Sequence, residues 1–428
     1  MRPLLFLALA AQLFAAEKVK PDVLHRPSPI PDRIILTWSA DPSTTQSVTW
    51  RTDKSVAEAC AEIAPSTAGP QFLKLAQRIA ARTEALKSES YEALYHAVEF
   101  TGLKPDTPYL YRVGDGANWS EWNQFRTASA DPRAPLEFIY VGDAQNDIWA
   151  MWSRVIRQSL LDAPRARFIV HAGDLVNRSA RDEEWGEWFM APGWIIRSIP
   201  SLPTPGNHEY PSKGALNANW KPQFTLPGNG VPGLEETNYY IDIHGLRLIS
   251  LNSNEKQDEQ AAWLDQLLAA NPHPWVICAF HHPIFSTARG RDNKRLRETW
   301  QPVFDRHAVD MVLTGHDHTY GRTNVMSGAP PVKSKSGTVY VVSVSGPKMY
   351  RHDKARVHAR IAEDTQLFQV IRIAGGRLSY EARTAAGELF DAFDLVKQKN
   401  RPNRLVPKPG LSPPSPRGQA GSPASTSQ

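Results

Sequence analysis

The stretch RFIVHAGDLVN, residues 167–177, decides the fold, because an apolar run leads directly into a glycine and an aspartate, Asp174. Four other apolar runs end in polar residues of the same kind: VGD at Asp143, PTPGNH at Asn207, AFH at His281 and TGHDH at His316 and His318. Short apolar runs separated by amphipathic helices are typical of a layered α/β domain with strands buried on both faces. Because ligands bind beyond the carboxyl ends of such strands, one topology brings all these side chains together.

Two domains are expected between the ends of the chain. Residues 30–128 contain alternating runs such as RIILTWSADPSTTQSVTWRT, punctuated by turn residues, and predict an all-β sandwich. Within it, residues 68–90 carry apolar residues at a spacing that favours a helical insertion. Residues 135–396 form the predicted α/β domain, and its last part, from residue 365 onward, predicts closing antiparallel strands.

The two ends differ from the rest in composition. Residues 1–16 have an early arginine, an apolar run too short to span a bilayer and small residues at Ala15 and Ala16, which indicates a secretory signal peptide. Phe14 stands where a small residue is preferred at the cleavage site, so a retained anchor is the alternative. Residues 398–428 are rich in Pro, Ser and Gly and predict a disordered tail. We therefore expect an exported protein, periplasmic or extracellular, without a stable membrane span.

Composition narrows the function further. The 428 residues are 41% hydrophobic, which is ample for packed cores, and the formal net charge of +5 is spread along the chain. Such a charge indicates mild attraction for anions, and no nucleic-acid binding is expected. The only two cysteines, Cys60 and Cys278, lie more than two hundred positions apart and are expected to stay unpaired.

The polar groups at the strand ends are suited to metal ions. Hard oxygens and imidazoles favour Mn, Fe, Zn or Mg. The coordinating groups are Asp143, Asp174, Asn207, His281, His316 and His318. They are too many for one tetrahedral ion and fit two ions that share a carboxylate. Two such ions roughly 3.5 to 4 Å apart form a clamp for in-line displacement at phosphorus.

The motifs GD, GDxxN, GNHE, HxP and GHxH, in this order, resemble the calcineurin-like metallophosphoesterases. The preceding β-module, with TGLKPDTPYLYRV near its end, makes the purple acid phosphatases the nearest branch. The resemblance implies a layered metallophosphoesterase sandwich preceded by a fibronectin type III-like sandwich. It also implies one ion held by Asp143, Asp174 and His318, and a second ion held by Asp174, Asn207, His281 and His316. Asp174 would then bridge the two ions.

Two positions depart from that branch. Asn177 replaces the tyrosine whose phenolate binds iron(III) and gives the colour, and Gln145 replaces a glycine. Either amide oxygen could complete the coordination of the first ion, but neither brings the charge that favours a ferric ion. We therefore predict a colourless enzyme that uses divalent metals. Further histidines of the family are missing after His281, and Arg289 or Arg291 is expected to bind the substrate phosphate in their place, the alternative being that both are solvated.

The resemblance implies a dinuclear-metal phosphoesterase that hydrolyses phosphomonoesters, as an acid phosphatase does, by attack of a metal-bound hydroxide. Asp174 and His208 are the catalytic candidates, His208 as the group that contacts the phosphoryl group and protonates the leaving group. The expected partner is a small-molecule phosphate ester. A phosphodiesterase or nucleotidase is the alternative within enzymes, and a catalytically silent binding module is the alternative outside them. His282 is expected to be structural, because neighbours on a strand point to opposite faces.

Overall fold

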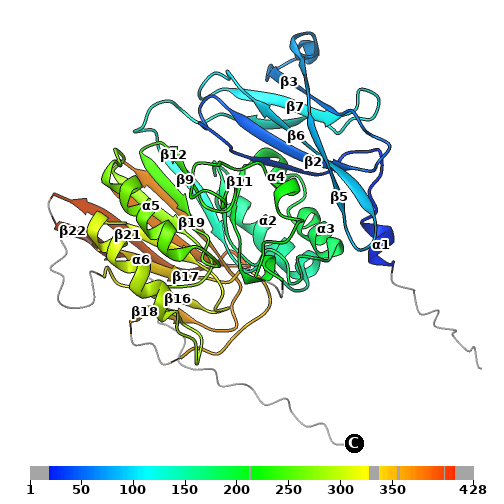
Figure 1. Cartoon of the computed structure of the whole chain (residues 1–428). Coiled ribbons are helices and arrows are strands. Elements are labelled where there is room, and N and C mark those ends of the chain that lie inside the picture. Colours follow the sequence, from blue (N-terminus) through cyan, green and yellow to red (C-terminus); the bar gives the residue numbers. More distant parts are fainter. Residues whose placement is uncertain (1–18, 212–213, 327–336, 354–356, 400, 410–428) are drawn as a thin grey trace, which may run out of the picture.

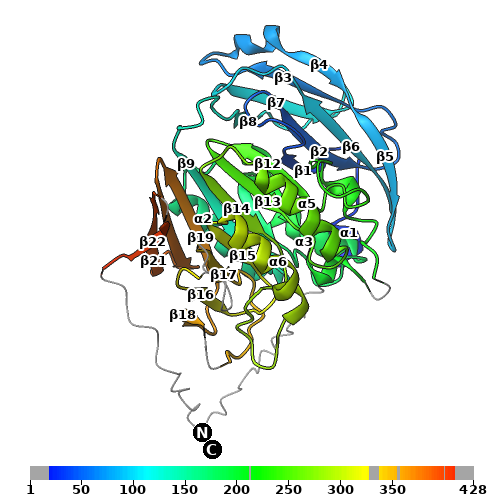
Figure 2. The same cartoon turned by 60° about the vertical axis from the view of Figure 1, so that its left-hand side comes forward.

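The computed structural model describes residues 19–211, 214–326, 337–353, 357–399 and 401–409. Figures 1 and 2 show an all-β domain packed on one end of a larger layered domain. The predicted signal peptide, residues 1–16, and the predicted tail from residue 410 onward lie outside the described residues. None of the helices in the described part of the chain has the length and apolar content needed to cross a bilayer.

The N-terminal domain is a sandwich of two four-stranded sheets, preceded by the short helix α1 (Pro21–Leu24). The first sheet has the order β1 (Asp32–Thr37), β2 (Gln46–Thr52), β6 (Glu92–Phe100) and β5 (Arg82–Lys87). The second has the order β4 (Gln77–Ala80), β3 (Cys60–Pro65), β7 (Pro108–Gly114) and β8 (Asn123–Arg126). Alternate side chains of both sheets fill one apolar core, which confirms the predicted sandwich.

The predicted helical insertion at residues 68–90 is wrong. A single 3₁₀ turn, η1 (Pro70–Leu75), is followed by the strands β4 and β5. β4 pairs with β3 and β5 pairs with β6, both antiparallel. Cross-strand pairing with an available sheet edge therefore outweighs the helical spacing of the apolar residues.

The second domain contains two seven-stranded sheets. The first has the order β11 (Ser201–Thr204), β10 (Ile169–Ala172), β9 (Leu136–Val141), β19 (Leu367–Ala374), β20 (Arg377–Thr384), β21 (Leu389–Gln398) and β22 (Arg401–Pro407). The second has the order β12 (Tyr239–Ile243), β13 (Leu246–Ser250), β14 (Trp275–Ala279), β15 (Met311–Thr314), β17 (Val339–Val342), β16 (Tyr320–Thr323) and β18 (His358–Ala362). Within each sheet the strands that precede the polar loops are parallel: β9 to β11 in one, β13 to β15 in the other.

Helices cover the outer faces of both sheets and confirm the layered α/β fold (Figure 2). The π-helical turn η2 (Ile148–Trp152) leads into α2 (Ser153–Asp162), and α3 (Asp182–Met190) and α4 (Ile195–Ser198) follow β10. α5 (Gln257–Ala269) and α6 (Lys294–His307) lie on the second sheet, and η3 (Asn207–Glu209) and η4 (Lys221–Gln223) are single 3₁₀ turns. In β14, Ile277 packs in the core between the sheets, whereas Val276 and Cys278 pack in the core beneath α5 and α6. Burial on both faces explains why this strand is apolar throughout.

The predicted disordered tail begins too early in the sequence. Residues 401–407 form β22, which pairs antiparallel with β21, and Leu405 packs against the main core. Its prolines are tolerated because β22 is the edge strand of its sheet. The antiparallel strands expected from residue 365 onward are β19, β20 and β21, as predicted.

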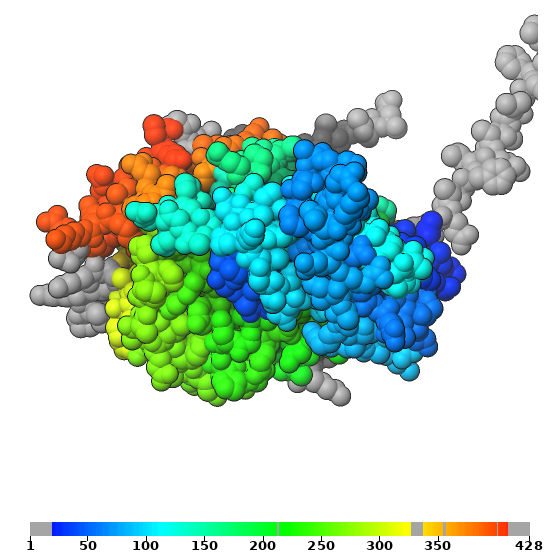
Figure 3. All heavy atoms as spheres, turned by 90° about the horizontal axis from the view of Figure 1, so that it is seen from above, coloured from blue at the N-terminus to red at the C-terminus, as the bar shows by residue number. Residues whose placement is uncertain are grey.

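The two domains share a buried interface, and the N-terminal domain lies closely against the second domain in the space-filling view of Figure 3. Ile35 and Trp38 of the N-terminal domain belong to the apolar core of the second domain, where Trp38 packs edge-on against Phe168. Thr37 Oγ1 donates a hydrogen bond of 2.6 Å to the carbonyl oxygen of Thr225. Cys60 and Cys278 are both free thiols, as expected.

Candidate metal centre

Five loops at the carboxyl ends of parallel strands converge on one site. Asp143 follows β9, Asp174 follows β10, and Asn207 follows β11. His281 follows β14, and His316 with His318 follows β15, so the second sheet supplies the histidines. The structure therefore brings the six predicted metal ligands together from two different sheets.

Four of these residues have a left-handed backbone: Asp143 (φ 52°), Asp174 (φ 50°), His316 (φ 72°) and His318 (φ 47°). Each such conformation costs of order 1 kcal/mol for a residue other than glycine, and it clusters at functional sites. Here it turns the chain sharply off the sheet, so that the side chain points across the strand ends.

One group of ligands consists of Asp143, Asp174 and His318, whose coordinating atoms lie within 4.8 Å of one another and are all buried. Gln145 lies beside them, with Nε2 at 3.0 Å from Asp174 Oδ2 and 3.3 Å from His318 Nε2. Gln145 Oε1 is buried and has no hydrogen-bond partner among the described residues. A buried amide oxygen without a donor is uncommon, so this atom is an unused acceptor next to the group.

A second group surrounds His281. Its Nε2 lies 3.1 Å from Asn207 Oδ1, 3.1 Å from Asp174 Oδ2 and 3.1 Å from His316 Nδ1. Asp174 therefore contacts both groups. This arrangement and these donor types fit two metal ions bound side by side.

The histidine rings are held from behind by backbone carbonyl groups. His281 Nδ1 donates to Ala172 O and His318 Nδ1 to Lys348 O, each at 2.9 Å. His208 Nδ1 donates to Asn177 O at 2.6 Å. With Nδ1 so engaged, each ring presents Nε2 to the centre, which is the arrangement usual for metal-ligating imidazoles.

The electrostatics of the site favour positive charge. Burial raises the pKa of the Asp143 carboxyl well above its ordinary value. Burial alone would also raise the pKa of Asp174, but the charge on His281 holds it below its usual range. Burial lowers the pKa of His281, yet the Asp174 carboxylate outweighs this and raises it to about 9. The buried Asp174 carboxylate thus favours positive charge on the fully buried imidazole of His281.

Glycines allow the two loop systems to approach closely. A Cβ added to Gly315 would lie 2.2 Å from Asp143 Oδ2, and one added to Gly206 would lie 2.1 Å from Asp174 Oδ1. Neither glycine has a positive φ, so it is the missing side chain rather than the backbone conformation that is required. Any side chain at these two positions would displace a carboxylate of the centre.

Glu209 is a residue of the centre that the sequence interpretation missed. Its buried carboxylate accepts hydrogen bonds from the backbone amides of Asp174 (3.0 Å), Leu175 (2.9 Å) and Gly206 (2.7 Å). It therefore fixes the β10 loop, which carries the shared carboxylate, to the β11 loop. Its place in GNHE, next to two site residues, was the available signal.

His282 is closer to the site than predicted. Its ring centre lies 4.3 Å from that of His316, and its Nδ1 lies 2.8 Å from Ser253 Oγ. His281, His282 and His316 have ring nitrogens within 4.8 Å of one another. The alternation of a strand does not apply here, because β14 ends at Ala279.

The remaining predicted residues differ in their positions. Arg291 donates a hydrogen bond of 3.0 Å to the carbonyl oxygen of His316 and lies over the ring of Tyr350, which contacts the ring of His318. Arg289 is exposed, and its backbone amide bonds to Arg351 O. Asn177 joins the site through its carbonyl oxygen, which accepts the His208 hydrogen bond.

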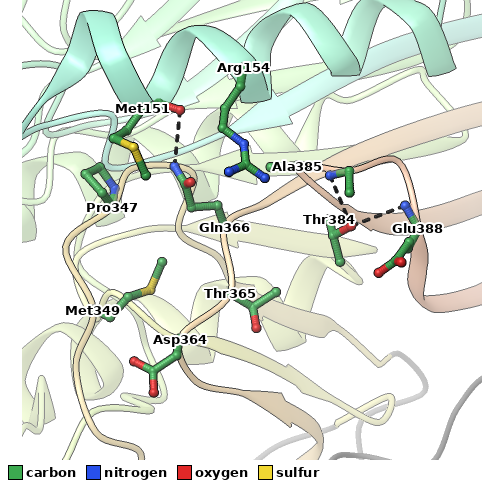
Figure 4. A pocket seen from close by; sticks show the side chains of 11 residues that line it. Met151, Arg154, Pro347, Met349, Asp364, Thr365, Gln366, Thr384, Ala385 and Glu388 are labelled. Carbon is green, nitrogen blue, oxygen red and sulfur yellow. Dashed lines mark hydrogen bonds between the residues drawn. The ribbon is translucent and has the colours of Figure 1, made fainter. Parts of the chain in front are cut away.

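A cavity of about 390 Å³ lies beside the segment that holds His318, between η2 and the turn from β20 to β21 (Figure 4). Its lining includes Met151, Arg154, Met349, Gln366 and Glu388. None of the predicted site residues lines it. The metal centre is therefore distinct from this cavity.

Comparison with known proteins agrees with the fold. Residues 136–320 match the family model of the calcineurin-like phosphoesterases, and residues 31–127 match that of the purple acid phosphatase N-terminal domain. A purple acid phosphatase from yellow lupin seeds has the same fold, with a TM-score of 0.73 and 19% identity over 86% of this chain and 74% of that chain. A structure of PhoD gives a TM-score of 0.68 and 14% identity over 90% of this chain and 93% of that chain.

Similar sequences are known from bacteria, plants and animals. The chain is 27% identical over 334 residues to an uncharacterized protein of Mycobacterium tuberculosis, covering 69% of this chain and 62% of the relative. It is 25% identical over 244 residues to purple acid phosphatase 21 of Arabidopsis thaliana, covering 53% of each. It is 24% identical over 369 residues to acid phosphatase type 7 of Danio rerio, covering 73% of this chain and 80% of the relative. The chain thus spans less than two thirds of the length of the first two relatives.

The layered fold, the ligand set and the match over residues 136–320 define a metal-dependent phosphoesterase domain. The chain therefore carries a purple acid phosphatase N-terminal domain over residues 31–127, followed by a calcineurin-like phosphoesterase domain over residues 136–320.

Proposed function

We propose that this protein hydrolyses phosphomonoesters, in the manner of an acid phosphatase, with two divalent metal ions as cofactors. The observation that carries the proposal is the position of Asp174. Its carboxylate lies in the group formed with Asp143 and His318, and also 3.1 Å from His281 Nε2. A carboxylate shared between two ligand groups is what a two-metal phosphoesterase requires.

The residues divide into two ligand sets in this proposal. Asp143, Asp174 and His318, with Gln145 or Asn177 as a further oxygen donor, hold one ion. Asp174, Asn207, His281 and His316 hold the other. When bound, the two ions supply Lewis acidity, which activates water near neutral pH and neutralises charge on the phosphoryl oxygens. Fe, Zn, Mn and Mg all suit these donors.

His208 protonates the leaving group. Its Nε2 lies 3.8 Å from Asp174 Oδ2, and its side chain is 25% exposed, so the ring faces both the centre and incoming substrate. As the oxygen of water bonds to phosphorus, the bond from phosphorus to the leaving oxygen breaks, and that oxygen takes the proton from Nε2. The proton released by the attacking water restores the proton of His208.

Arg291 binds the substrate phosphate at the rim. It is held by His316 O and by the face of Tyr350, and its side chain is 33% exposed. A guanidinium group so placed can bond to two phosphoryl oxygens. Arg289, which is exposed and lacks these contacts, is the weaker of the two candidates.

The proposed setting is outside the cytoplasm, with a small phosphate ester as substrate. The apolar segment at residues 1–16 supports export to the periplasm or the extracellular space. The modest and dispersed positive charge supports a small anionic substrate over a nucleic acid.

The test compares p-nitrophenyl phosphate with bis(p-nitrophenyl) phosphate as substrates of the metal-loaded protein. Faster hydrolysis of the monoester is expected, and preference for the diester would replace the proposal with a phosphodiesterase. Bound metal without hydrolysis of either ester would indicate a silent binding module. Asp174→Asn should reduce bound metal, measured by elemental analysis. His208→Ala should reduce turnover of an alkyl phosphomonoester such as ethyl phosphate at unchanged metal content, because an alkoxide needs a proton in order to leave.

A further inference from the structure

Helix α3 lies between the N-terminal domain and the metal centre, and it contacts both. Its first residue, Asp182, faces the N-terminal domain, and Glu184 faces the loop that follows Asp174. The helix packs on the main core through Trp185 and Trp188, whose side chains are fully buried. A displacement of α3 would therefore be transmitted to the loop that follows Asp174.

On the side of the centre, the carboxylate of Glu184 holds a turn of the backbone. Glu184 Oε2 accepts hydrogen bonds from the amides of Asn177 (2.8 Å) and Arg178 (2.7 Å), and Oε1 accepts one from Arg178 Nε (2.6 Å). The Trp185 indole donates a further bond of 2.9 Å to Ser179 O. The turn at residues 177–179 is thus fixed by two consecutive side chains of α3.

The turn at residues 177–179 orients His208. The carbonyl oxygen of Asn177 accepts the hydrogen bond of His208 Nδ1 at 2.6 Å, and this bond leaves Nε2 directed toward Asp174. The orientation of the imidazole therefore depends on the position of the Asn177 peptide group. Glu184 sets this position, because it accepts the hydrogen bond of the Arg178 amide, which belongs to the same peptide group as the Asn177 carbonyl.

On the opposite side, the N-terminal domain clamps the start of α3. Arg33 of β1 donates to Asp182 Oδ1 at 2.7 Å, and Arg51 of β2 donates to Asp182 Oδ2 at 3.1 Å. The ring of His25 lies so close to Gly186 that a Cβ there would meet it at 2.4 Å. The side chains of Arg33, Arg51 and Asp182 are buried, so solvent screens their charges little.

We propose that α3 is a positioning element for His208: Glu184 fixes the turn that orients the imidazole, and the N-terminal domain fixes α3 through Asp182. This inference rests on the proposed function, because it assumes that His208 donates a proton to the leaving oxygen. Neither Glu184 nor Asp182 touches substrate in this proposal. The one proposed metal ligand among their cited contacts is Asn177, which Glu184 meets at the backbone amide and not at the side chain. They act only through the orientation of His208.

The test uses two phosphomonoesters that differ in leaving group, ethyl phosphate and p-nitrophenyl phosphate. An alkoxide needs a proton from His208 in order to leave, whereas a nitrophenolate leaves well without one. Glu184→Ala is therefore expected to lower kcat for ethyl phosphate by roughly 10- to 100-fold, a part of the 10²- to 10⁴-fold that general acids supply. Its kcat for p-nitrophenyl phosphate should fall by less than about 3-fold, with unchanged metal content.

Two controls separate positioning from general damage. Glu183→Ala removes a neighbouring carboxylate of α3 that contacts Arg181 at 3.6 Å. This variant should leave unchanged the ratio of kcat for ethyl phosphate to kcat for p-nitrophenyl phosphate. In a His208→Ala background, Glu184→Ala should cause no further change in this ratio, because residues that act through one group are not additive. Glu184→Gln, which keeps one acceptor oxygen, should give an intermediate ratio.

Asp182→Asn tests the contribution of the N-terminal domain and should lower the same ratio by roughly 3- to 10-fold, since it loosens α3 without removing Glu184. An unchanged ratio in Asp182→Asn would overturn the link to the domain. Equal losses for both esters in Glu184→Ala, or a ratio like that of the wild type, would overturn the inference itself. A wild-type protein that hydrolyses neither ester would instead overturn the proposed function.

Discussion

The buried charge cluster between the domains gives a stability prediction whose size follows from the structure. Asp182 lies between Arg33 and Arg51, and the relative exposures of the three side chains are 4%, 3% and 1%. Burial alone would raise the pKa of Asp182, but the two guanidinium groups hold it below its ordinary value, so the carboxylate is charged at neutral pH. Asp182→Asn removes this charge and keeps the shape of the side chain.

The expected cost can be derived from the partners that remain. Removing one partner of a buried ion pair costs about 3–5 kcal/mol, because the other charge stays buried and uncompensated. Arg51 keeps Asp32, to which its Nη2 donates at 2.6 Å, so Arg33 is the charge that loses its carboxylate. We therefore expect the lower end of the range, about 3 kcal/mol.

Urea denaturation followed by tryptophan fluorescence measures this cost. For an m-value of about 1.5 kcal/mol per M, a loss of about 3 kcal/mol moves the midpoint of the affected transition by about 2 M. The control is Asp258→Asn, which breaks a surface pair with Arg295 whose side chains are 67% and 74% exposed and should shift the midpoint by less than about 0.5 M. A shift for Asp182→Asn no larger than that of the control would refute the electrostatic account of the interface.

Three further predictions concern the centre and the N-terminal domain. Gly315→Ala should lower the bound metal measured by elemental analysis, because its Cβ would lie 2.2 Å from Asp143 Oδ2, whereas Gly228→Ala, with no atom nearer than 3.8 Å, should leave it unchanged. Burial lowers the pKa of His96 to about 4, while an unfolded histidine titrates near 6.5, so this residue should cost about 3 kcal/mol of stability as the pH falls from about 6.5 to 4. Urea midpoints at pH 7 and pH 5 should therefore differ less for His96→Gln than for the wild type, and equal differences would contradict this. Because Asn177 offers no phenolate, the metal-loaded protein should show no absorption band in the visible spectrum, and a band there would mean that another residue binds a ferric ion.

The ligands of the centre were predictable because their signal is local. Each one follows an apolar run, and the strand ends of a layered sheet have to meet at one edge. Asp174 and His318 could therefore be placed together although well over a hundred residues separate them. The layered fold followed from the same runs, since burial on both faces leaves strands such as β14 without polar positions.

Other features depend on tertiary contacts that leave no local pattern. Nothing in the local sequence distinguishes Glu209 from an acidic residue on the surface. It links two loops only because its carboxylate points inward and accepts hydrogen bonds from the amides of Asp174 and Gly206. His282 was assigned by strand alternation, which no longer holds beyond Ala279. Residues 68–90 have helical spacing, but the edges of β3 and β6 are available for pairing, and the resulting strands β4 and β5 are more favourable.

The insertion of Ile35 and Trp38 into the neighbouring core has a consequence for how this architecture is inherited. A sandwich of this kind is usually regarded as an interchangeable module, yet here replacement by an unrelated sandwich of the same topology would leave two cavities in the core of the second domain. Filling such holes requires matched substitutions on both sides, so the two halves of the gene are expected to diverge together rather than to be shuffled separately.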